Sequence, residues 1–379
     1  MKKTLEIRDE VLPVLAPNGG EEEVEAIRVA IESGWWGKGP KVEEFEEKFA
    51  ELVGHKYAVA VTSNSHALDL IIKALNFRNI DVINPSISFL TTAVVPLWNG
   101  CSSNIVDVEP TSLCIDAYDV DRFKKPQSEL LIAVDMAGIK ADYKAIRKVF
   151  NGFVVQDCAH SCWYPGAGLD GDAAVWSFQA VKTMPAGDGG MITTNDRQLA
   201  DRCRELSWFG IPSTWNRLKN NNGQRRYSWD YEVSSVGYKC SMNDLTASIC
   251  LVQMSKLHNN LKHRRQIQSS YNKELNENIG RPAYSDTVQY YIARVPAQHR
   301  DPLMAYLAER NIHTSVHYKP LYLHEPLRQN RKYSVSEKEW VKLISLPCHN
   351  KMTAGDVDYV VAWVNRYFEE AHESFRPQT

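Results

Sequence analysis

Short, continuous apolar runs separated by helical patterns are the feature that most constrains the fold of this chain. The runs lie within residues 56–195 and read KYAVAVT, DVINPS, NIVDVE, LLIAVDM, GFVVQD, DAAVWSF and GGMITTN. Helical patterns lie between several of them, for example SHALDLIIKAL at residues 65–75 and YKAIRKVF at residues 143–150. Strands that are apolar on both faces are typical of a parallel sheet with helices on each side. We therefore predict an α/β fold with a mainly parallel central sheet covered by helices on both faces.

Longer helical patterns flank this region. Two amphipathic patterns end at Gly34 and Gly54, with the loop GWWGKGP between them. Another runs from Asn243 to about Glu274, and it predicts a bridge from a large domain (residues 1–250) to a smaller C-terminal α/β domain (residues 251–379). In this second domain we predict strands at residues 290–296 and 313–318, and helices at residues 301–311 and from Ala354 to about His372.

Composition excludes several classes of protein. The formal net charge of -2 over 379 residues argues against nucleic acid or anionic lipid as a partner. No stretch approaches the length of an apolar membrane span, and the opening MKKTLEIRDE lacks the apolar core of a secretory signal. The 8 cysteines are scattered without a framework spacing. We expect reduced thiols in a cytoplasmic protein.

A lysine and an aspartate at strand ends indicate a cofactor. In AVWSFQAVKTMPAGDGGM (residues 174–191), Ser177 ends an apolar run, Lys182 follows, and a glycine cluster closes the segment. Asp157 ends the run VVQD, at the carboxyl end of a parallel strand, where open α/β sheets bind ligands. Pyridoxal phosphate needs such a pair, because the lysine forms a Schiff base and the carboxylate partners the pyridine nitrogen. His160 follows within one turn and is a candidate contact of the ring or of its phenolic oxygen.

A turn of small polar residues is a candidate phosphate site. TSNSHAL (residues 62–68) lies between a strand and a helix, so unpaired helix amides and the Ser65 hydroxyl face the same ligand. Ser177 is a second hydroxyl donor at a strand end. The alternatives are a solvated lysine at position 182, a helix-capping aspartate at position 157 and an ordinary serine N-cap.

Two other motifs are rejected as sites. Cys158, His160 and Cys162 resemble a soft metal site, but no further ligand pair with zinc-type spacing follows, and we predict no metal. GAGLDG (residues 166–171) matches a dinucleotide fingerprint, yet it precedes a strand pattern rather than a helix.

Together these motifs resemble the DegT–StrS family of aminotransferases, along nearly the whole chain. The most specific match is the lysine signature S-F-x-x-x-K-x-x-x-x-G-E/D-G-G at residues 177–190. Further matches are G-x-G-P-x-V-x-x-F-E-x-x-F-A at residues 37–50, the phosphate turn at 63–68, E-D-x-A-Q/H at 156–160, V-H-Y-x-P-L at 316–321 and L-P-x-H at 346–349.

The resemblance implies a fold type I pyridoxal phosphate enzyme that works as a homodimer with shared active sites. It implies the following cofactor contacts: Ser63, Asn64, Ser65, Phe89, Asp157, His160, Ser177, Gln179, Lys182 and Lys239. Candidate substrate contacts are Trp36, Trp229, His317 and Tyr318. Lys239 stands where the family has an asparagine that reaches the partner subunit's phosphate, and Ser241 removes a family arginine. Asn64 replaces a glycine, which requires a backbone conformation that suits asparagine.

The resemblance also implies the reaction. We expect an aminotransferase that converts a nucleotide-linked keto sugar to an amino sugar with L-glutamate as donor, with Lys182 and Asp157 as catalytic residues. An aminotransferase acting on a cyclitol ketone and a non-catalytic pyridoxal phosphate-binding regulatory protein remain alternatives. Dehydratase relatives carry histidine at the lysine position, so Lys182 argues against that chemistry.

Overall fold

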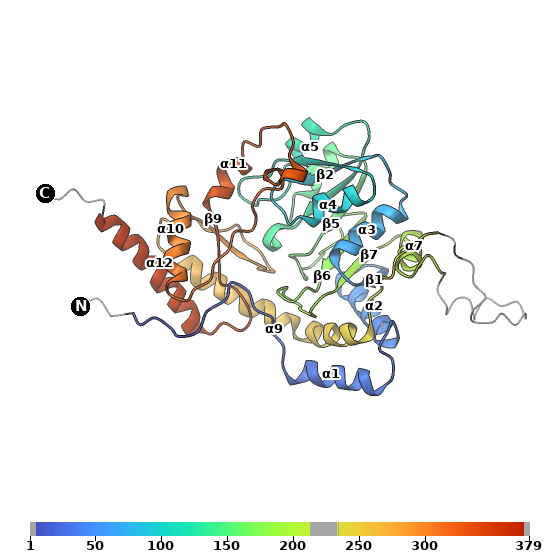
Figure 1. The fold of residues 1–379 in the computed structure, drawn as a ribbon, viewed down its shortest axis with the longest axis horizontal. Coiled ribbons are helices and arrows are strands. Elements are labelled where there is room, and N and C mark those ends of the chain that lie inside the picture. The colour runs from blue at the N-terminus through green and yellow to red at the C-terminus, as the bar shows by residue number, and fades with distance from the viewer. Residues whose placement is uncertain (1–4, 213–232, 234, 375–379) are drawn as a thin grey trace, which may run out of the picture.

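A seven-stranded sheet forms the centre of the molecule (Figure 1). The computed structural model describes residues 5–212, 233 and 235–374 of the chain. The strands follow the order β1-β7-β6-β5-β4-β2-β3 across the sheet. Their bounds are β1 Tyr57–Val61, β2 Asp81–Pro85, β3 Ser102–Val106, β4 Ser128–Val134, β5 Phe153–Asp157, β6 Ala173–Ser177 and β7 Gly190–Thr194.

Strand β7 runs antiparallel to the other six strands. It pairs antiparallel with both β1 and β6, while all other pairs of neighbours are parallel. Parallel neighbours need a crossover connection, whereas β6 and β7 are joined directly by the loop that carries Lys182. The predicted fold class, a mainly parallel sheet with helices on both faces, is confirmed.

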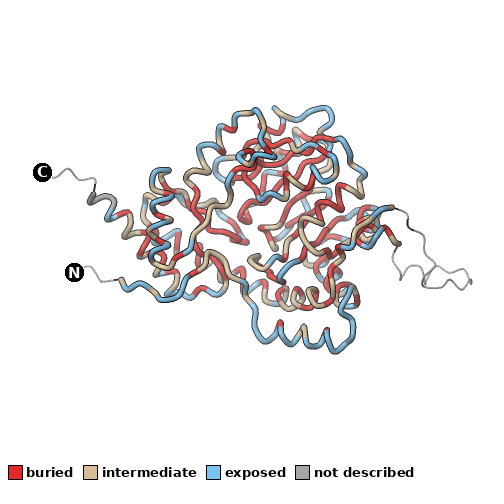
Figure 2. Tube along the Cα trace, viewed as in Figure 1, coloured by how far each residue is buried: buried red, intermediate tan, exposed pale blue. Residues whose placement is uncertain are grey.

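The strand residues alternate between two cores, one on each face of the sheet. In β1, Val59 and Val61 pack with one face, and Ala58 and Ala60 pack with the other. Helices α3 (Asn64–Ala74), α4 (Thr91–Trp98) and α7 (Arg197–Ser207) cover the first face. Helices α2 (Pro40–Val53), α5 (Ala117–Phe123), α6 (Tyr143–Val149) and α9 (Asp244–Glu274) cover the second. Figure 2 shows buried residues concentrated on the strands and on the inner sides of these helices.

Local capping signals explain several helix bounds. Helix α2 begins with Pro40 after Gly39 and ends at Gly54, whose φ of 77° is the left-handed conformation that glycine favours. Helix α1 (Glu21–Glu32) ends directly before its C-cap residue Ser33, which Gly34 follows. Helix α9 starts after Asn243, whose side chain accepts a hydrogen bond from the Thr246 amide. The bounds predicted for these three helices are confirmed within about two residues.

A second, two-stranded sheet lies in the C-terminal part of the chain. It pairs β8 (Tyr291–Arg294) with β9 (Leu343–Leu346), and α10 (Ala297–Ala308) and α12 (Ala354–Ser374) pack around it together with the C-terminal half of α9. The short elements η1 (Met136–Gly138), η2 (Leu321–Leu323), η3 (Glu325–Leu327), α11 (Ser336–Glu339) and η4 (Trp340–Lys342) complete the described structure. The predicted domain boundary at residue 250 stays a prediction.

The strand predicted at residues 313–318 is wrong. Only Ser315 pairs there, with Ser345 of β9, and β9 is four residues long. The chain then turns toward the large sheet, where the Leu321 amide donates to the Ser86 carbonyl at 2.8 Å. Residues 313–318 therefore have too short a neighbouring strand to pair with, and they do not form a strand.

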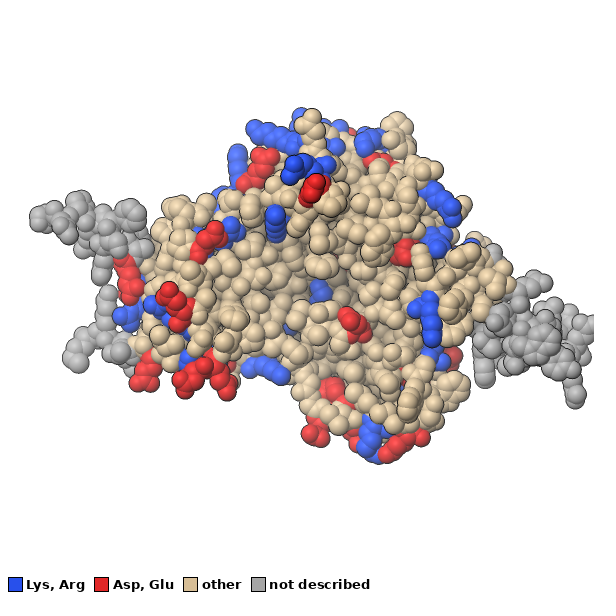
Figure 3. All heavy atoms as spheres, in the orientation of Figure 1, with Lys and Arg blue, Asp and Glu red and all other residues tan. Residues whose placement is uncertain are grey.

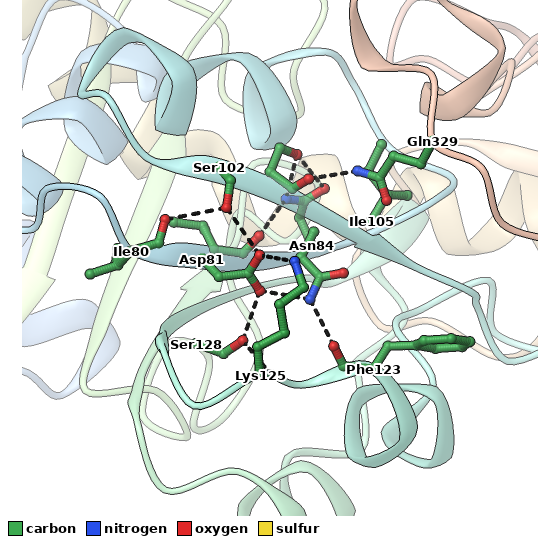
Figure 4. Close-up of polar contacts among 12 residues, drawn as sticks. Ile80, Asp81, Asn84, Ser102, Ile105, Phe123, Lys125, Ser128 and Gln329 are labelled. Carbon is green, nitrogen blue, oxygen red and sulfur yellow. Dashed lines mark hydrogen bonds and ion pairs between the residues drawn. The ribbon is translucent and has the colours of Figure 1, made fainter.

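Polar side chains fasten the β2–β3 side of the large sheet (Figure 4). Asp81 is fully buried and accepts hydrogen bonds from Lys125 Nζ at 2.6 Å, Ser128 Oγ at 2.7 Å and Asn104 Nδ2 at 2.7 Å. These contacts hold the Asp81 pKa below its ordinary value, although burial acts in the opposite direction. Strands β2, β3 and the start of β4 are thereby joined at one buried carboxylate.

The outer edge of β3 is covered by side chains from residues 329–333. Gln329 Nε2 donates to the Ser103 carbonyl at 2.6 Å, and Arg331 Nη1 donates to the Ile105 carbonyl at 2.5 Å. Tyr333 Oη donates to the same Ile105 carbonyl at 3.3 Å. The C-terminal third of the chain therefore satisfies acceptors that a bare edge strand would expose.

Several global features follow from the described residues. No helix among them is long and apolar enough to cross a membrane. All eight cysteines are free, and seven of them are buried. The face shown in Figure 3 carries acidic and basic side chains interspersed around its rim, without a large patch of one sign.

Candidate active site

Residues from four strand ends share one edge of the large sheet. Strands β1, β2, β5 and β6 all run in the same direction, so their carboxyl ends lie together. The residues that follow or end these strands are Ser63–Ser65 after β1, Phe89 after β2, Asp157 at the end of β5, and Ser177 and Lys182 at and after β6. This is the edge at which α/β sheets bind their ligands.

Asp157 is a buried carboxylate with one oxygen held and one open. Its Oδ1 accepts hydrogen bonds from the Ala159 amide at 3.0 Å and from Asn64 Nδ2 at 3.1 Å. Its Oδ2 accepts none from the residues that the structure describes. Asp157 is 3% exposed, and burial raises its pKa to about 6, while the two hydrogen bonds and the charge of Lys182 act the other way. A cationic partner at Oδ2 would be strongly favoured here.

Asn64 has a backbone conformation that suits asparagine. It is the first residue of α3, and it is not among the non-glycine residues with positive φ. No strained backbone is therefore needed where the family has glycine. Its side chain instead orients Asp157.

The turn before α3 combines a helix-capping serine with a second serine whose hydroxyl bonds the neighbouring helix. Ser63 is the N-cap, and its Oγ accepts from the His66 amide at 3.2 Å. Ser65 therefore does not have the capping role considered as its alternative. Its Oγ shares a hydrogen bond of 2.8 Å with Thr91 Oγ1 of α4, a contact that the sequence did not indicate.

Gly190 packs directly against this turn. A Cβ atom at Gly190 would lie 2.3 Å from the Ser63 carbonyl carbon and 2.6 Å from the Asn64 nitrogen. Backbone cannot yield as a flexible side chain does, so β7 can approach the turn only with glycine at this position.

Gly190→Ala is expected to lower the free energy of unfolding by about 1–3 kcal/mol, since the Ser63–Asn64 backbone must shift. Denaturant unfolding and a cofactor titration measure the effect, with weaker cofactor binding expected alongside the lost stability. Gly37→Ala is the control, because a Cβ there meets nothing within 4 Å. Equal stability of the two variants would contradict the packing argument.

Lys182 lies half-buried in the loop between β6 and β7. Its amide donates to the Gln179 carbonyl at 2.8 Å, and the Gln179 side chain accepts from the Val181 amide at 3.0 Å. Gln179 therefore supports the turn itself in this structure. Lys182 Nζ is 6.0 Å from the ring centre of Tyr290 and donates to no carboxylate among the described residues. Its charge lowers the pKa of Asp157 and of His160, so the three groups are neighbours.

A cluster of rings faces the same place. His160 Nδ1 accepts from the Ala137 amide at 3.4 Å, so the neutral ring carries its proton on Nε2 and donates it to Tyr318 Oη at 3.1 Å. Burial lowers the pKa of His160 well below its ordinary value, which keeps it neutral. Tyr318 Oη also contacts Tyr290 Oη at 3.1 Å, and His317 stacks on Tyr290 at 3.9 Å. The ring centre of Phe89 lies 6.0 Å from that of Tyr318.

Tyr290 was missed as a site residue. It falls inside the strand predicted at residues 290–296, where an aromatic residue is an ordinary core residue, and no motif marks it. Its hydroxyl and its distance to Lys182 are visible only once β8 is placed beside the large sheet.

Three of the candidate residues are not placed in this cluster. Trp36 is 59% exposed in the loop between α1 and α2, and its Nε1 donates to the Ile31 carbonyl at 3.1 Å. Lys239 is exposed, with its Nζ 5.6 Å from the ring centre of Trp208. Trp229 lies outside the described residues.

The rejected metal motif forms other contacts. Cys158 Sγ lies 3.9 Å from Asp135 Oδ2, and His160 bonds Tyr318. Within residues 5–212, 233 and 235–374, no three His, Cys, Asp or Glu side chains are grouped so that they could hold a metal ion.

The pKa of Asp157 gives the cofactor-free protein a pH dependence. A carboxyl whose folded pKa is about 6, above its ordinary 3.8, binds its proton more tightly in the folded state. The free energy of unfolding should therefore fall by up to about 3 kcal/mol as the pH rises from about 4 to above 6. Urea unfolding of wild type and of Asp157→Asn across this range isolates the effect. Parallel curves for the two proteins would contradict it.

The sheet is mainly parallel, a loop lysine follows β6, and a buried aspartate ends the neighbouring strand β5. Together these features define a fold type I pyridoxal phosphate-dependent enzyme. Residues 17–365 match the model of the DegT/DnrJ/EryC1/StrS aminotransferase family, and the chain belongs to this family. The predicted family, fold, enzyme class and cofactor, pyridoxal 5′-phosphate, are confirmed.

Relatives of known sequence and structure agree with this assignment. The chain is 33% identical to the spore coat polysaccharide biosynthesis protein SpsC of Bacillus subtilis, over 93% of this chain and 96% of that protein. The structure of the aminotransferase TlmJ from Streptoalloteichus hindustanus is 28% identical with a TM-score of 0.88, covering 95% of this chain and all of the other. The PLP form of Spr1654 from Streptococcus pneumoniae is 25% identical with a TM-score of 0.85, covering 95% and 99%. Transamination of a sugar, the general part of the predicted function, is supported by this family.

Proposed function

We propose that this protein transfers an amino group from L-glutamate to a nucleotide-linked keto sugar. The observation that carries the proposal is the open Oδ2 of buried Asp157 beside the Lys182 amine, at the carboxyl edge of the sheet. SpsC is described as a polysaccharide biosynthesis protein, and amino sugars are a product class that suits such a role.

The residues present fit pyridoxal phosphate. Lys182 supplies the amine that binds the cofactor aldehyde, and Asp157 Oδ2 supplies the acceptor for the pyridine nitrogen. The phosphate would be held by Ser65, Ser177 and the free amides at the start of α3. Phe89 and His160 would contact the ring. Ser63 and Asn64 contribute through the cap and through Asp157.

Bound pyridoxal phosphate supplies an electron sink for negative charge at the reacting carbon. Asp157 keeps the ring nitrogen protonated, since a buried carboxylate next to a cation favours the charged form of both. Lys182, once released from the cofactor, would act as general base toward the α-carbon of glutamate and as general acid toward the cofactor carbon within one half-reaction, and in the opposite sense in the other. The product of glutamate leaves before the keto sugar binds, so ping-pong kinetics are expected.

The ring cluster would orient the substrate. Neutral His160 donates to Tyr318 Oη, and Tyr318 Oη in turn contacts Tyr290 Oη. The proton on His160 Nε2 therefore fixes the orientation of both tyrosine hydroxyl groups. His317 and Tyr318 are the proposed substrate contacts from this chain, with Trp36 and Trp229 as further candidates. Burial lowers the pKa of His317 to about 3, so it would bind as a neutral hydrogen-bonding group.

We further propose a cytoplasmic homodimer. The large exposed apolar side chains Trp35 and Trp36, at 57% and 59% exposure, suit a covered surface. Lys239 is exposed and would reach the partner subunit's phosphate as a point charge. Eight free cysteines suit a reducing compartment.

Mass spectrometry of products tests the substrate. The reconstituted enzyme is supplied with L-glutamate and with dTDP-, UDP- or GDP-linked keto sugars, and amination of one of them is expected. Conversion of a cyclitol ketone with no nucleotide sugar used would replace the proposed substrate class. A visible cofactor band that persists after addition of glutamate would favour a regulatory protein without turnover.

A further inference from the structure

The Gln289 side chain forms hydrogen bonds to the backbone on both sides of Lys182. Gln289 is 1% exposed and lies two residues before the start of β8, far from the lysine in the sequence. Its Oε1 accepts hydrogen bonds from the Thr183 amide at 3.1 Å and from Thr183 Oγ1 at 3.0 Å. Its Nε2 donates to the Val181 carbonyl at 3.0 Å. The residues immediately before and after the lysine are thus bound by one side chain.

Gln289 is itself fixed from two directions. Its amide donates to the carbonyl of Ala137 at 3.2 Å, the same residue whose amide donates to His160 Nδ1. Its carbonyl accepts from Nη1 of Arg264 at 3.1 Å, an α9 side chain that is 1% exposed. Arg264 has no carboxylate partner among its described contacts. Its guanidinium instead donates hydrogen bonds to Asn350 Oδ1 and to the carbonyls of Val288, Gln289 and Cys348.

The loop around Lys182 has little support of its own. It belongs to no helix or strand. Beside the lysine, its own hydrogen bonds join the Lys182 amide to the Gln179 carbonyl and the Val181 amide to the Gln179 side chain, and further along the Ala186 amide donates to the Phe178 carbonyl at 2.8 Å. A lysine that must leave the cofactor, move a proton and bind again needs its backbone in one place. A displacement of about 1 Å at a reacting group can cost roughly 100-fold in rate.

We propose that Gln289 is a positioning residue for Lys182, holding the Val181 carbonyl and the Thr183 amide so that the lysine returns to the same place after each half-reaction. The inference rests on the proposed role of Lys182. It links that role to the chain segment that also carries Tyr290, whose ring lies 6.0 Å from the lysine amine.

Three variants dissect the contact. Gln289→Ala removes all three hydrogen bonds. Gln289→Glu keeps the acceptor for Thr183 but cannot donate to the Val181 carbonyl and places a negative charge against it. Thr183→Val removes one hydroxyl contact and keeps the amide contact and the side-chain volume. Gln253→Ala is the matched control, because Gln253 is equally buried at 1% exposure and bonds Asn18 and Glu23 instead.

The measurements use holoenzyme and read the lysine directly. We expect the single-turnover half-reaction with glutamate to slow about 100-fold in Gln289→Ala, at least as much in Gln289→Glu and least in Thr183→Val, with KM for glutamate changed less than about 3-fold. The midpoint of the pH titration of the visible band should shift in the same order, and borohydride trapping of cofactor on Lys182 should slow. Gln253→Ala should lose thermal stability while leaving the rate and the titration unchanged.

The outcomes separate this inference from the proposed function. If borohydride labels Lys182 in wild type, yet Gln289→Ala keeps the wild-type rate and titration, positioning by Gln289 is refuted and the lysine's role stands. If wild-type Lys182 stays unlabelled, the proposed function fails first. If Gln289→Ala does not fold, the test passes to Thr183→Val and Gln289→Glu, whose unchanged rate and titration would likewise overturn the inference.

Discussion

Lys182→Ala is expected to abolish transamination and the visible absorbance of the lysine-bound cofactor. The amine makes the covalent link and moves the proton, and acid–base catalysis alone contributes about 10²- to 10⁴-fold. The variant should still fold, because the half-buried Lys182 side chain has no hydrogen-bond acceptor among the described residues and its loop is held through backbone atoms. Steady-state turnover with glutamate, the visible spectrum and peptide mapping after borohydride treatment measure the loss.

Lys182→Arg is the informative companion. It keeps a positive charge beside Asp157 and His160 but cannot form the link, so it separates electrostatic support from covalent chemistry. Both variants should be inactive. Full turnover in Lys182→Ala would remove the lysine from its role.

Asp157→Asn is expected to bind the cofactor and yet to lose roughly 10²- to 10³-fold in kcat. The substitution keeps the shape of the side chain and an oxygen for the Ala159 and Asn64 contacts, so the fold should persist. It removes the charge that holds the ring nitrogen protonated, and breaking a buried ion pair of this kind costs about 3–5 kcal/mol. Single-turnover rates with glutamate and cofactor titrations separate binding from chemistry.

A matched comparison sharpens this second test. Asn64→Ala leaves the carboxylate in place and removes one hydrogen bond to its Oδ1, so its effect on kcat should be much smaller than that of Asp157→Asn. An unchanged kcat in Asp157→Asn would refute the electron-sink argument.

The strands of the large sheet and several helices could be predicted from the sequence, because the patterns that specify them are local. Apolar runs and capping residues predicted the seven strands and the helices α1, α2 and α9, since burial on both faces and helix ends leave marks within a few residues. The antiparallel direction of β7 and the absence of a strand at residues 313–318 depend on which partner lies alongside, and that is a property of the assembled sheet.

The same distinction holds for the site. Lys182 and Asp157 could be picked out because they stand at the ends of apolar runs, where parallel strands present their side chains to a ligand. Gln289, Tyr290 and Thr91 come from distant segments and sit in patterns that are ordinary for a strand or a helix start. Their roles arise from tertiary contacts such as the 3.0 Å hydrogen bond from Gln289 to the Val181 carbonyl.

The side chains that cover β3 have a consequence for any shortened form of the chain. Gln329, Arg331 and Tyr333 come from the last fifth of the sequence, yet they occupy the carbonyls at the border of the N-terminal sheet. A protein cut near residue 250 would present that border unshielded, ready to add strands from neighbouring copies and grow into aggregates. The C-terminal segment of this enzyme therefore shields the edge of the N-terminal sheet, which we expect to aggregate when it is separated from that segment.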